Sequence, residues 1–478
     1  MSGASAAIED DLLQSITGVL NLWLAGKCPS ILGEFVYSAP LTPLLKPGGG
    51  LRPIAVGTIW RRLCSKLAAN SVCKSMNPYL GNFQYGVGIL CGGEGILHSA
   101  NRLIELCGSD TSKTMLLIEF TNAFNLVDRS TIIREVRARC PSIAYWVEFC
   151  YMKPARLYYR DHILSSTQGV QQGDPLGPLL FALALHPLIE KIASNCTLDF
   201  NAWYLDDGTI AGDTLEVYQA FKILQDVGPS YGLHLNIAKT ELFWPSFDPR
   251  RESAFPVNTG KDTDGVKLLG GPVSLDPSFC CRTVAHRVDK TIQLMDKIQM
   301  LCDPQCELLL LRSCTGLSRL FFALCTTCPM ALLPAAERFD SYLMQYLRRL
   351  VVGDNAGFGK VQQRLDTLPI KERGGGGGGL GVLTMDDTMH YCFLASQLQT
   401  RHLQLSILKT PATSDLCPGF LNALLHFEQA CRISSPNFNI NDTAPQYMKS
   451  LAAIYFGAVR DHVPSSFAPS PREFAVWK

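Results

Sequence analysis

The sequence lacks an uninterrupted apolar run of the length that a membrane-spanning helix needs. Residues 177–189 (GPLLFALALHPLI) form one of its longest apolar stretches, whereas a membrane-spanning helix needs about 20 residues. Another run, residues 308–336, is interrupted by Arg312 and Arg319. The N-terminal sequence MSGASAAIEDDLLQS also lacks the basic region and apolar core of a secretory signal. We therefore expect no membrane span and a reducing compartment, in which the 18 cysteines are free thiols.

The sequence also lacks a convincing set of zinc ligands. Two cysteine pairs are close in sequence, Cys302 with Cys306 and Cys325 with Cys328. Both pairs lie in apolar, helix-like sequence without a nearby histidine or a further cysteine at ligand spacing. We interpret these residues as buried structural thiols, because free cysteine is among the most often buried residue types.

Excess positive charge is nearly absent, since the 478-residue chain has a net charge of +1. This total does not favour nucleic-acid binding, because phosphate contacts need lysine and arginine. The distribution differs from the total, since no acidic residue lies between Glu34 and Glu94. That interval contains Lys46, Arg52, Arg61, Arg62, Lys66 and Lys74. It predicts a local basic surface, either for phosphate binding or as a solvated face.

Hydrophobic periodicity divides the chain into a mixed first part and a helical second part. In the first part we expect a helix at 8–26, a strand, glycine turn and strand at 44–56, a helix at 57–76, a strand at 114–120 and a helix that begins near Thr121 or Asn122. In the second part we expect helices at 282–301, 306–325, 337–353 and 385–404, with a linker that includes the glycine run 374–379.

Two adjacent carboxylates, Asp206 and Asp207, interrupt the apolar stretch NAWYLDDGTI at 201–210. Asp-Gly between two apolar runs is a strong hairpin signal, so an ordinary turn is one interpretation. Like charges about 4 Å apart repel by about 4 kcal/mol at an effective dielectric of 20, and a divalent cation would remove that cost. A third acid, Glu119, ends the predicted strand at 114–120, and acids at strand ends can meet on one sheet.

Several motifs, in order, resemble the reverse transcriptase domain of non-LTR, LINE-like retroelements of the form found in plants. The resemblance covers about residues 10–275 and continues more weakly to about 405. The motifs are KPGGGLRPIAVGTIWRRL at 46–63, QYGVGILCGGEGILHSANR at 84–102, IEFTNAFNLVDR at 118–129, QGVQQGDPLGPLLF at 168–181, YLDDG at 204–208, GLHLNIAKTELF at 232–243 and VKLLGGPVS at 266–274.

The resemblance implies an α+β fold of the right-hand polymerase type. Its parts would be fingers and palm at 1–275, with an antiparallel palm sheet, and a helical thumb-like region at 276–353. A glycine-rich linker at 354–379 and a mainly helical C-terminal region at 380–478 would follow. The implied activity is RNA-directed DNA synthesis from deoxynucleoside triphosphates, with an RNA template and a DNA primer as partners.

The resemblance also assigns roles to residues. Glu119, Asp206 and Asp207 would bind Mg²⁺, with Mn²⁺ as a possible substitute, and Lys239 would lie near the leaving pyrophosphate. The predicted nucleotide-binding residues are Lys46, Arg52, Phe124, Gln172 and Gly173, with Phe124 as an aromatic gate against a ribose 2′-hydroxyl. The predicted primer-binding loop consists of Leu269, Gly270 and Gly271.

One residue departs from the family pattern, because Glu119 stands where the family usually has aspartate. The extra methylene displaces the carboxylate, and a shift of about 1 Å at a reacting centre can cost roughly a hundredfold in rate. Two hypotheses therefore stay open: a polymerase, active or attenuated, and an inactive remnant or non-catalytic nucleic-acid-binding protein. Neither an endonuclease block, a zinc knuckle nor an RNase H acid set is recognisable, so we expect either a fragment of a mobile-element protein or a lone polymerase module derived from one. We expect a nuclear or cytoplasmic location.

Overall fold

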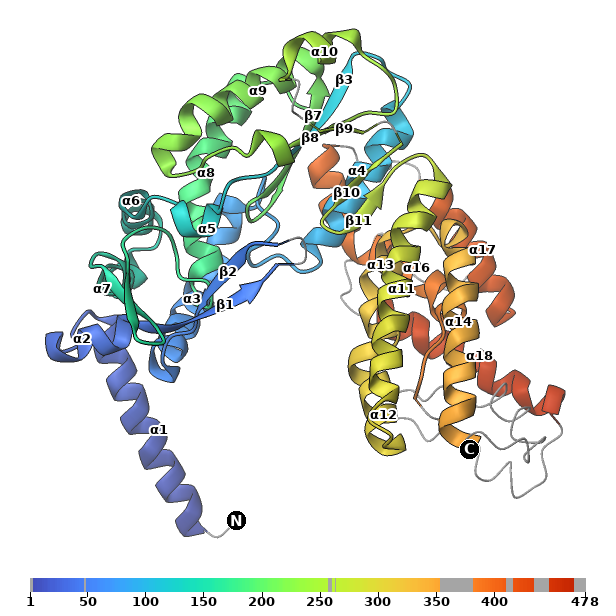
Figure 1. Ribbon diagram of the computed structural model, residues 1–478, viewed down its shortest axis with the longest axis horizontal. Helices are drawn as coiled ribbons and strands as arrows, with labels where there is room; N and C mark the ends of the chain where they lie inside the picture. The colour runs from blue at the N-terminus through green and yellow to red at the C-terminus, as the bar shows by residue number, and fades with distance from the viewer. Residues whose placement is uncertain are drawn as a thin grey trace. The chain divides into compact units, whose positions relative to one another are not determined.

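The computed structural model describes most of the chain, and its residues fall into two compact units. The described residues are 3–46, 49–256, 260–262, 264–352, 381–409, 416–433 and 447–467. Unit 1 contains Met1–Leu90, Thr111–Phe243 and Phe247–Lys261, whereas unit 2 contains Cys91–Asp110, Trp244–Ser246 and Asp262–Lys478. Figure 1 labels the helices and strands of both units.

A five-stranded sheet forms the centre of unit 1, in the order β6-β7-β3-β8-β9. Its strands are β3 (Lys113–Ile118), β6 (Phe200–Tyr204), β7 (Asp207–Asp213), β8 (Glu241–Phe243) and β9 (Gly260–Asp262). Strand β3 pairs antiparallel with β7, from Lys113 opposite Asp213 to Ile118 opposite Gly208. The predicted hairpin forms as β6–β7 and closes with Tyr204 opposite Asp207. Its turn residues are Leu205 and Asp206, so the Asp-Gly pair that signals a turn lies at the start of β7.

A second sheet of unit 1 has the order β2-β1-β4-β5. Its strands are β1 (Ala39–Leu45), β2 (Leu51–Ala55), β4 (Ala155–Tyr159) and β5 (His162–Ser166). Strands β1 and β2 form the predicted basic hairpin, whose turn includes Gly49 and Gly50 at positive φ angles of 87° and 85°. These backbone angles favour glycine because an L side chain rarely adopts them.

Helices surround the two sheets and bury the core of unit 1. They are α1 (Gly3–Leu24), α2 (Ser30–Tyr37), α3 (Ile59–Leu80), α5 (Ala123–Leu126), α6 (Arg129–Arg139), α7 (Ala144–Tyr151), α8 (Gly177–Asn195), α9 (Thr214–Val227) and α10 (Pro249–Ala254). Helix α8 lies within the core, and its side chains from Leu179 to Leu185 are all buried. This burial explains why its sequence is apolar on nearly every face.

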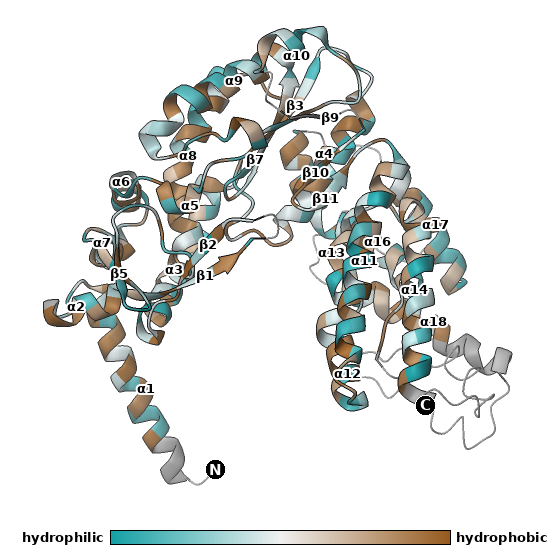
Figure 2. Ribbon diagram, viewed as in Figure 1, coloured by the Kyte–Doolittle hydropathy of each residue, from teal (hydrophilic) through white to brown (hydrophobic). Residues whose placement is uncertain are grey.

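Unit 2 is mainly helical and has a hydrophobic core of its own. Its helices are α4 (Gly92–Cys107), α11 (Pro277–Gln299), α12 (Pro304–Leu310), α13 (Phe321–Thr326), α14 (Pro329–Val352), α16 (Met385–Leu408), α17 (Pro418–Cys431) and α18 (Tyr447–Phe467). Strands β10 (Val266–Leu268) and β11 (Gly271–Val273) form a small hairpin. Figure 2 shows hydrophobic and hydrophilic residues side by side along α11 and α14, as expected for helices that bury one face.

The predicted α+β class is confirmed, although two local predictions are wrong. The single helix expected at 306–325 is broken, because a π-helical turn at Leu311–Thr315 and a 3₁₀ turn at Leu317–Arg319 separate α12 from α13. Cys302 and Cys306 are exposed rather than buried, because they lie at the loop between α11 and α12 and in the first turn of α12. Cys325 is buried and Cys328 is partly buried, as expected.

One stretch, Pro304–Thr326, is long and apolar enough to cross a membrane by length and composition alone. Less than half of its most apolar window is buried, and core helices of soluble proteins pass the same test. The two breaks in this stretch and the burial of Leu311, Leu320 and Leu324 fit a place in the core of unit 2. The predicted glycine linker at 374–379 lies outside the described residues.

Candidate active site in unit 1

The three predicted metal-binding carboxylates lie at one end of the five-stranded sheet. Glu119 directly follows β3, whose last residue pairs with Gly208 of β7. Asp206 and Asp207 lie at the β6–β7 turn, next to that pair. The main chain at Glu119 is fixed by a hydrogen bond from the Asn236 amide to the Glu119 carbonyl, at 2.8 Å. Antiparallel pairing therefore brings together acids that are almost ninety positions apart in sequence.

The turn between β6 and β7 has little room for substitution. A Cβ atom at Gly208 would lie 2.4 Å from the ring of Trp203. Trp203 is fully buried and stacks on Phe120, with ring centroids 6.2 Å apart. Leu205 has a positive φ of 58°, a conformation that a non-glycine residue adopts only with strain. Asp206 therefore directly follows the strained residue Leu205. It also lies two positions before Gly208, where a larger residue would collide with Trp203.

Burial raises the pKa of all three carboxyl groups. Burial raises the pKa of Asp207 to about 6, and the negative charges of Asp206 and Glu119 add to this effect. Burial also raises the pKa of Asp206 and of Glu119, and Asp206 raises that of Glu119 further. The positive charge of Lys46 acts in the opposite direction, because it lowers the pKa of Asp206 and that of Glu119. The site thus accumulates negative charge that a bound cation would stabilise.

The donor set fits Mg²⁺ or Mn²⁺, because both ions prefer oxygen ligands. Among the described residues, no three His, Cys, Asp or Glu side chains are close enough together to hold one metal ion as they stand. The side chains of Glu119, Asp206 and Asp207 would therefore have to turn toward one another, from their present backbone positions, to share an ion. Their raised pKa values mean that the three carboxylates are costly to ionise in the folded protein, and a bound cation would offset that cost.

All nine residues predicted to catalyse or to bind the nucleotide line one cavity of about 680 Å³. They are Lys46, Arg52, Glu119, Phe124, Gln172, Gly173, Asp206, Asp207 and Lys239. The side chains of Lys46, Arg52 and Lys239 are exposed, so their charges are available to a ligand in the cavity. The structure therefore gathers the three predicted acidic side chains and the three predicted basic side chains around one cavity. This arrangement suits a metal-bound polyphosphate.

Phe124 is positioned by a ring contact, and the loop at Gln172 and Gly173 is positioned by main-chain contacts. The ring of Phe124 stacks on that of Phe181, with centroids 4.5 Å apart. The Ala55 amide donates to the Gln172 carbonyl at 2.8 Å, which joins the loop to the end of β2. Gly173 has a φ of 126°, and a Cβ atom there would lie 2.9 Å from the Ala55 carbonyl oxygen. A larger residue at 173 would separate this loop from β2.

A buried ion pair beneath this loop was not found by sequence reasoning. The guanidinium of Arg61 on α3 contacts the carboxylate of Asp174 at 2.8 Å, and both side chains are 1% exposed. Tyr151 donates its hydroxyl to the same carboxylate at 2.8 Å, and Arg61 also donates to the Tyr37 carbonyl at 2.7 Å. Burial acts to lower the pKa of Arg61, but Asp174 offsets this effect and the pKa is raised. No local pattern links two residues 113 positions apart.

The predicted primer-binding loop belongs to unit 2 and does not line this cavity. Leu269 and Gly270 form the two-residue turn between β10 and β11, with φ values of 46° and 84°, and Gly271 begins β11. Arg287 on α11 donates to the Gly270 carbonyl, which fixes the turn. The primer-binding role of these three residues stays a prediction.

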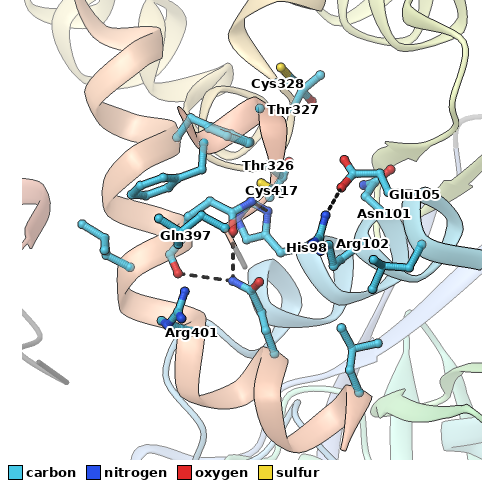
Figure 3. Close-up of a pocket in the computed structure, with 18 of the residues that line it drawn as sticks. His98, Asn101, Arg102, Glu105, Thr326, Thr327, Cys328, Gln397, Arg401 and Cys417 are labelled. Carbon is cyan, nitrogen blue, oxygen red and sulfur yellow. Dashed lines mark hydrogen bonds and ion pairs between the residues drawn. The ribbon is translucent and has the colours of Figure 1, made fainter. Parts of the chain in front are cut away.

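Unit 2 contains a separate cavity of about 420 Å³, which none of the predicted site residues lines. Figure 3 shows His98 and Arg102 of α4 facing Gln397 and Arg401 of α16 across it. The His98 ring is buried and contacts the Ser396 hydroxyl and the Gln397 amide, both at 2.9 Å. Burial lowers the pKa of His98 to about 3, so the ring is neutral and acts as part of the packed interior.

The site predicts a pH-dependent stability effect of Asp207. Because its pKa is raised from 3.8 to about 6, the folded state binds this proton more tightly than the unfolded state. The contribution of Asp207 to the free energy of unfolding is therefore complete below pH 3.8, and it is lost as the pH rises through about 6. We expect Asp207→Asn to raise the free energy of unfolding at pH 8 by about 1 kcal/mol, after a discount for solvent screening of an exposed side chain.

The measurement is urea unfolding of the wild type and Asp207→Asn at pH 5 and pH 8. The difference between the two proteins should be smaller at pH 5. Addition of Mg²⁺ at pH 8 should stabilise the wild type and leave the variant nearly unchanged. A difference that is equal at both pH values would contradict the raised pKa.

Comparison with known proteins shows what residues 44–273, which include most of unit 1 and parts of unit 2, are similar to. Residues 44–273 match the family model for reverse transcriptase (RNA-dependent DNA polymerase). A curated protein, the retrotransposable element SLACS 132 kDa protein of Trypanosoma brucei gambiense, is 27% identical over 218 residues. That alignment covers 44% of this chain and 18% of the relative, so the chain spans less than a fifth of the relative's length.

Solved structures show more distant similarity. A telomerase from Candida albicans, solved with a telomeric RNA fragment, is 11% identical and covers 72% of this chain and 66% of its own, with a TM-score of 0.39. An RNA-dependent RNA polymerase of a human picorbirnavirus is 12% identical, covers 69% and 62%, and has a TM-score of 0.40. TM-scores of this size establish neither fold nor function by themselves. Residues 44–273, which contain the three predicted metal-binding acids, are therefore similar to reverse transcriptase domains.

Proposed function

We propose that this chain is an RNA-directed DNA polymerase of a non-LTR retroelement resembling the LINE-like elements of plants. It would add deoxynucleotides to the 3′-hydroxyl of a DNA primer on an RNA template, in the nucleus or the cytoplasm. The observation that carries the proposal is the cavity of unit 1, which gathers all nine residues predicted for catalysis and nucleotide binding. The family match over residues 44–273 supports it.

Glu119, Asp206 and Asp207 would hold two divalent ions, Mg²⁺ or Mn²⁺. Such ions lower the pKa of the attacking hydroxyl and neutralise charge on the phosphoryl oxygens. The protein supplies three carboxylates whose pKa values are raised by burial, and those of Glu119 and Asp207 are raised further by neighbouring carboxylates. The same crowding that destabilises the empty cluster would favour the bound cations.

The other residues of the cavity would position the substrates. Lys46 and Arg52, at the ends of the β1–β2 turn, would pair with the triphosphate of an incoming nucleotide. Lys239 would place a proton or a positive charge beside the leaving pyrophosphate. Phe124, held by Phe181, would contact the sugar and exclude a 2′-hydroxyl. Gln172 and Gly173 would contact the nascent base pair, and the loop at 269–271 would contact the primer.

Primer extension on an RNA template tests the proposal, with the wild type compared to Glu119→Asp. We expect metal-dependent extension by the wild type and faster extension by Glu119→Asp, by up to about a hundredfold. The shorter side chain would place its carboxylate at the position that the metal geometry requires, and about 1 Å of misplacement can cost that factor. A matched control is Glu216→Asp, which makes the same change in the first turn of α9, away from the cavity. Slower extension by Glu119→Asp would show that the site has adapted to glutamate.

A second candidate function is nucleic-acid binding without catalysis. The observation that favours it is that the three carboxylates, as placed, do not form a cluster able to bind one ion. Binding of an RNA–DNA hybrid that weakens with salt, without any incorporation by the wild type or Glu119→Asp, would establish this function.

A further inference from the structure

The strained residue Leu205 directly precedes the metal-binding pair and needs support from its surroundings. It is the first of the two turn residues between β6 and β7, and Asp206 is the second. Its φ of 58° is left-handed, and such strain persists only where neighbouring groups over-determine the backbone. If Leu205 relaxed to a negative φ, the direction of the chain into Asp206 would change, and the carboxylate would leave its present place.

Gln84 provides that support through its side-chain amide. The Leu205 amide donates to Gln84 Oε1 at 2.7 Å, and Gln84 Nε2 donates to the Leu205 carbonyl at 3.3 Å. The Gly86 amide donates to the same Oε1 at 3.0 Å. Gln84 is fully buried, so water does not compete for these bonds. One side chain thus satisfies both main-chain groups of the strained residue.

The main chain around Gln84 is itself fixed to β6. The Trp203 amide donates to the Phe83 carbonyl at 2.7 Å, and the Tyr85 amide donates to the Trp203 carbonyl at 2.8 Å. This short parallel bridge brings the Gln84 side chain to the end of β6, where Leu205 begins the turn. Gly86 lies so close that a Cβ atom there would be 2.9 Å from the Leu205 amide nitrogen. The segment 83–86 therefore has close contact with the turn but does not line the cavity.

We propose that Gln84 is a positioning residue that holds Leu205 in its left-handed conformation and thereby sets the place of Asp206 for metal binding. This inference rests on the proposed function and adds a residue that the cavity itself does not include. Gln84 acts through the backbone of the turn, so its loss affects the metal site and the chemical step more than it affects nucleotide binding. Lys46 and Arg52, which would bind the triphosphate, lie on a different sheet.

Gln84→Asn tests the proposal, because it keeps the amide but is one methylene too short to reach both groups of Leu205. We expect hydrogen exchange over the hairpin 200–210, measured by mass spectrometry, to accelerate about tenfold or more. We also expect Mn²⁺ affinity, measured by calorimetry, to fall about tenfold, and kcat for primer extension to fall roughly ten- to a hundredfold. The KM for the nucleotide should stay within about threefold, a split that a general loss of folding would not produce.

Two further variants keep the test decisive. Gln84→Glu retains the acceptor for the Leu205 and Gly86 amides but cannot donate while ionised, so its effects should be intermediate. Asn82→Ala changes an exposed side chain on the same segment and should match the wild type. Wild-type Mn²⁺ affinity and kcat in Gln84→Asn would overturn the proposal, even if hydrogen exchange were faster.

The outcomes separate this inference from the proposed function. If the wild type binds Mn²⁺ but does not extend a primer, the proposed function fails, and the Mn²⁺ affinity of Gln84→Asn still decides the role of Gln84. If the wild type binds no Mn²⁺, both are overturned.

Discussion

Asp206→Asn is expected to reduce primer extension by about a thousandfold or more, equivalent to roughly 4 kcal/mol of transition-state stabilisation. Asparagine keeps the size of the side chain and removes the charge that would hold a divalent cation. Asp206 interacts electrostatically with four charged side chains, namely Glu119, Asp207, Lys46 and Arg52. Its loss should therefore affect the whole cluster rather than one contact.

The measurement is single-turnover extension in the wild type and in the Glu119→Asp background, so that a low wild-type rate does not hide the effect. Asp226→Asn is the matched control, since it makes the same change at an exposed position on α9. Binding of the RNA–DNA hybrid should change by less than about threefold in Asp206→Asn. Extension at the wild-type rate in Asp206→Asn would exclude this carboxylate from catalysis.

Arg61→Met is expected to destabilise the protein by about 3–5 kcal/mol, the usual result of leaving one charge of a buried pair without its partner. Asp174 would retain the Tyr151 hydroxyl but would lose the guanidinium at 2.8 Å. The loop at 171–174 should then separate from α3, because Arg61 also anchors it through Gln171. Urea unfolding followed by tryptophan fluorescence measures the loss, since Trp146 belongs to the same core.

Arg62→Met is a close control, because Arg62 is the next residue on α3 and its side chain is exposed. It should change the free energy of unfolding by less than about 0.5 kcal/mol. The double variant Arg61→Met with Asp174→Leu removes both charges and should recover much of the lost stability. If Arg61→Met alone were as stable as the wild type, the ion pair would not hold this loop.

The primary sequence predicted most of the candidate site. The β6–β7 hairpin, the acid at the end of β3 and the basic β1–β2 turn all follow from short-range signals, namely alternation, Asp-Gly and glycine turns. The motif order then associated nine residues that the structure finds around one cavity. Short-range rules work here because each predicted catalytic residue stands at or next to the end of a regular element.

Long-range pairing was not predictable in this way. Arg61 and Asp174, like Gln84 and Leu205, are more than 100 positions apart, and each pair depends on two elements that meet only in the folded chain. The break between α12 and α13 also escaped prediction, because a π turn keeps apolar residues at nearly helical spacing. The grouping of Cys91–Asp110 with unit 2 likewise depends on packing of α4 against α16, almost 300 positions later.

The sequence by itself thus determined the chemical character of this protein: three acids, three exposed bases and an aromatic residue in the order of a reverse transcriptase. Only the tertiary structure decided how that chemistry is held. The carboxylates repel one another and Leu205 is strained, so their arrangement depends on buried partners such as Gln84. The loop at 171–174 likewise depends on the buried pair of Arg61 and Asp174. Burial of those partners is a property of the packed core, which no local stretch of residues specifies.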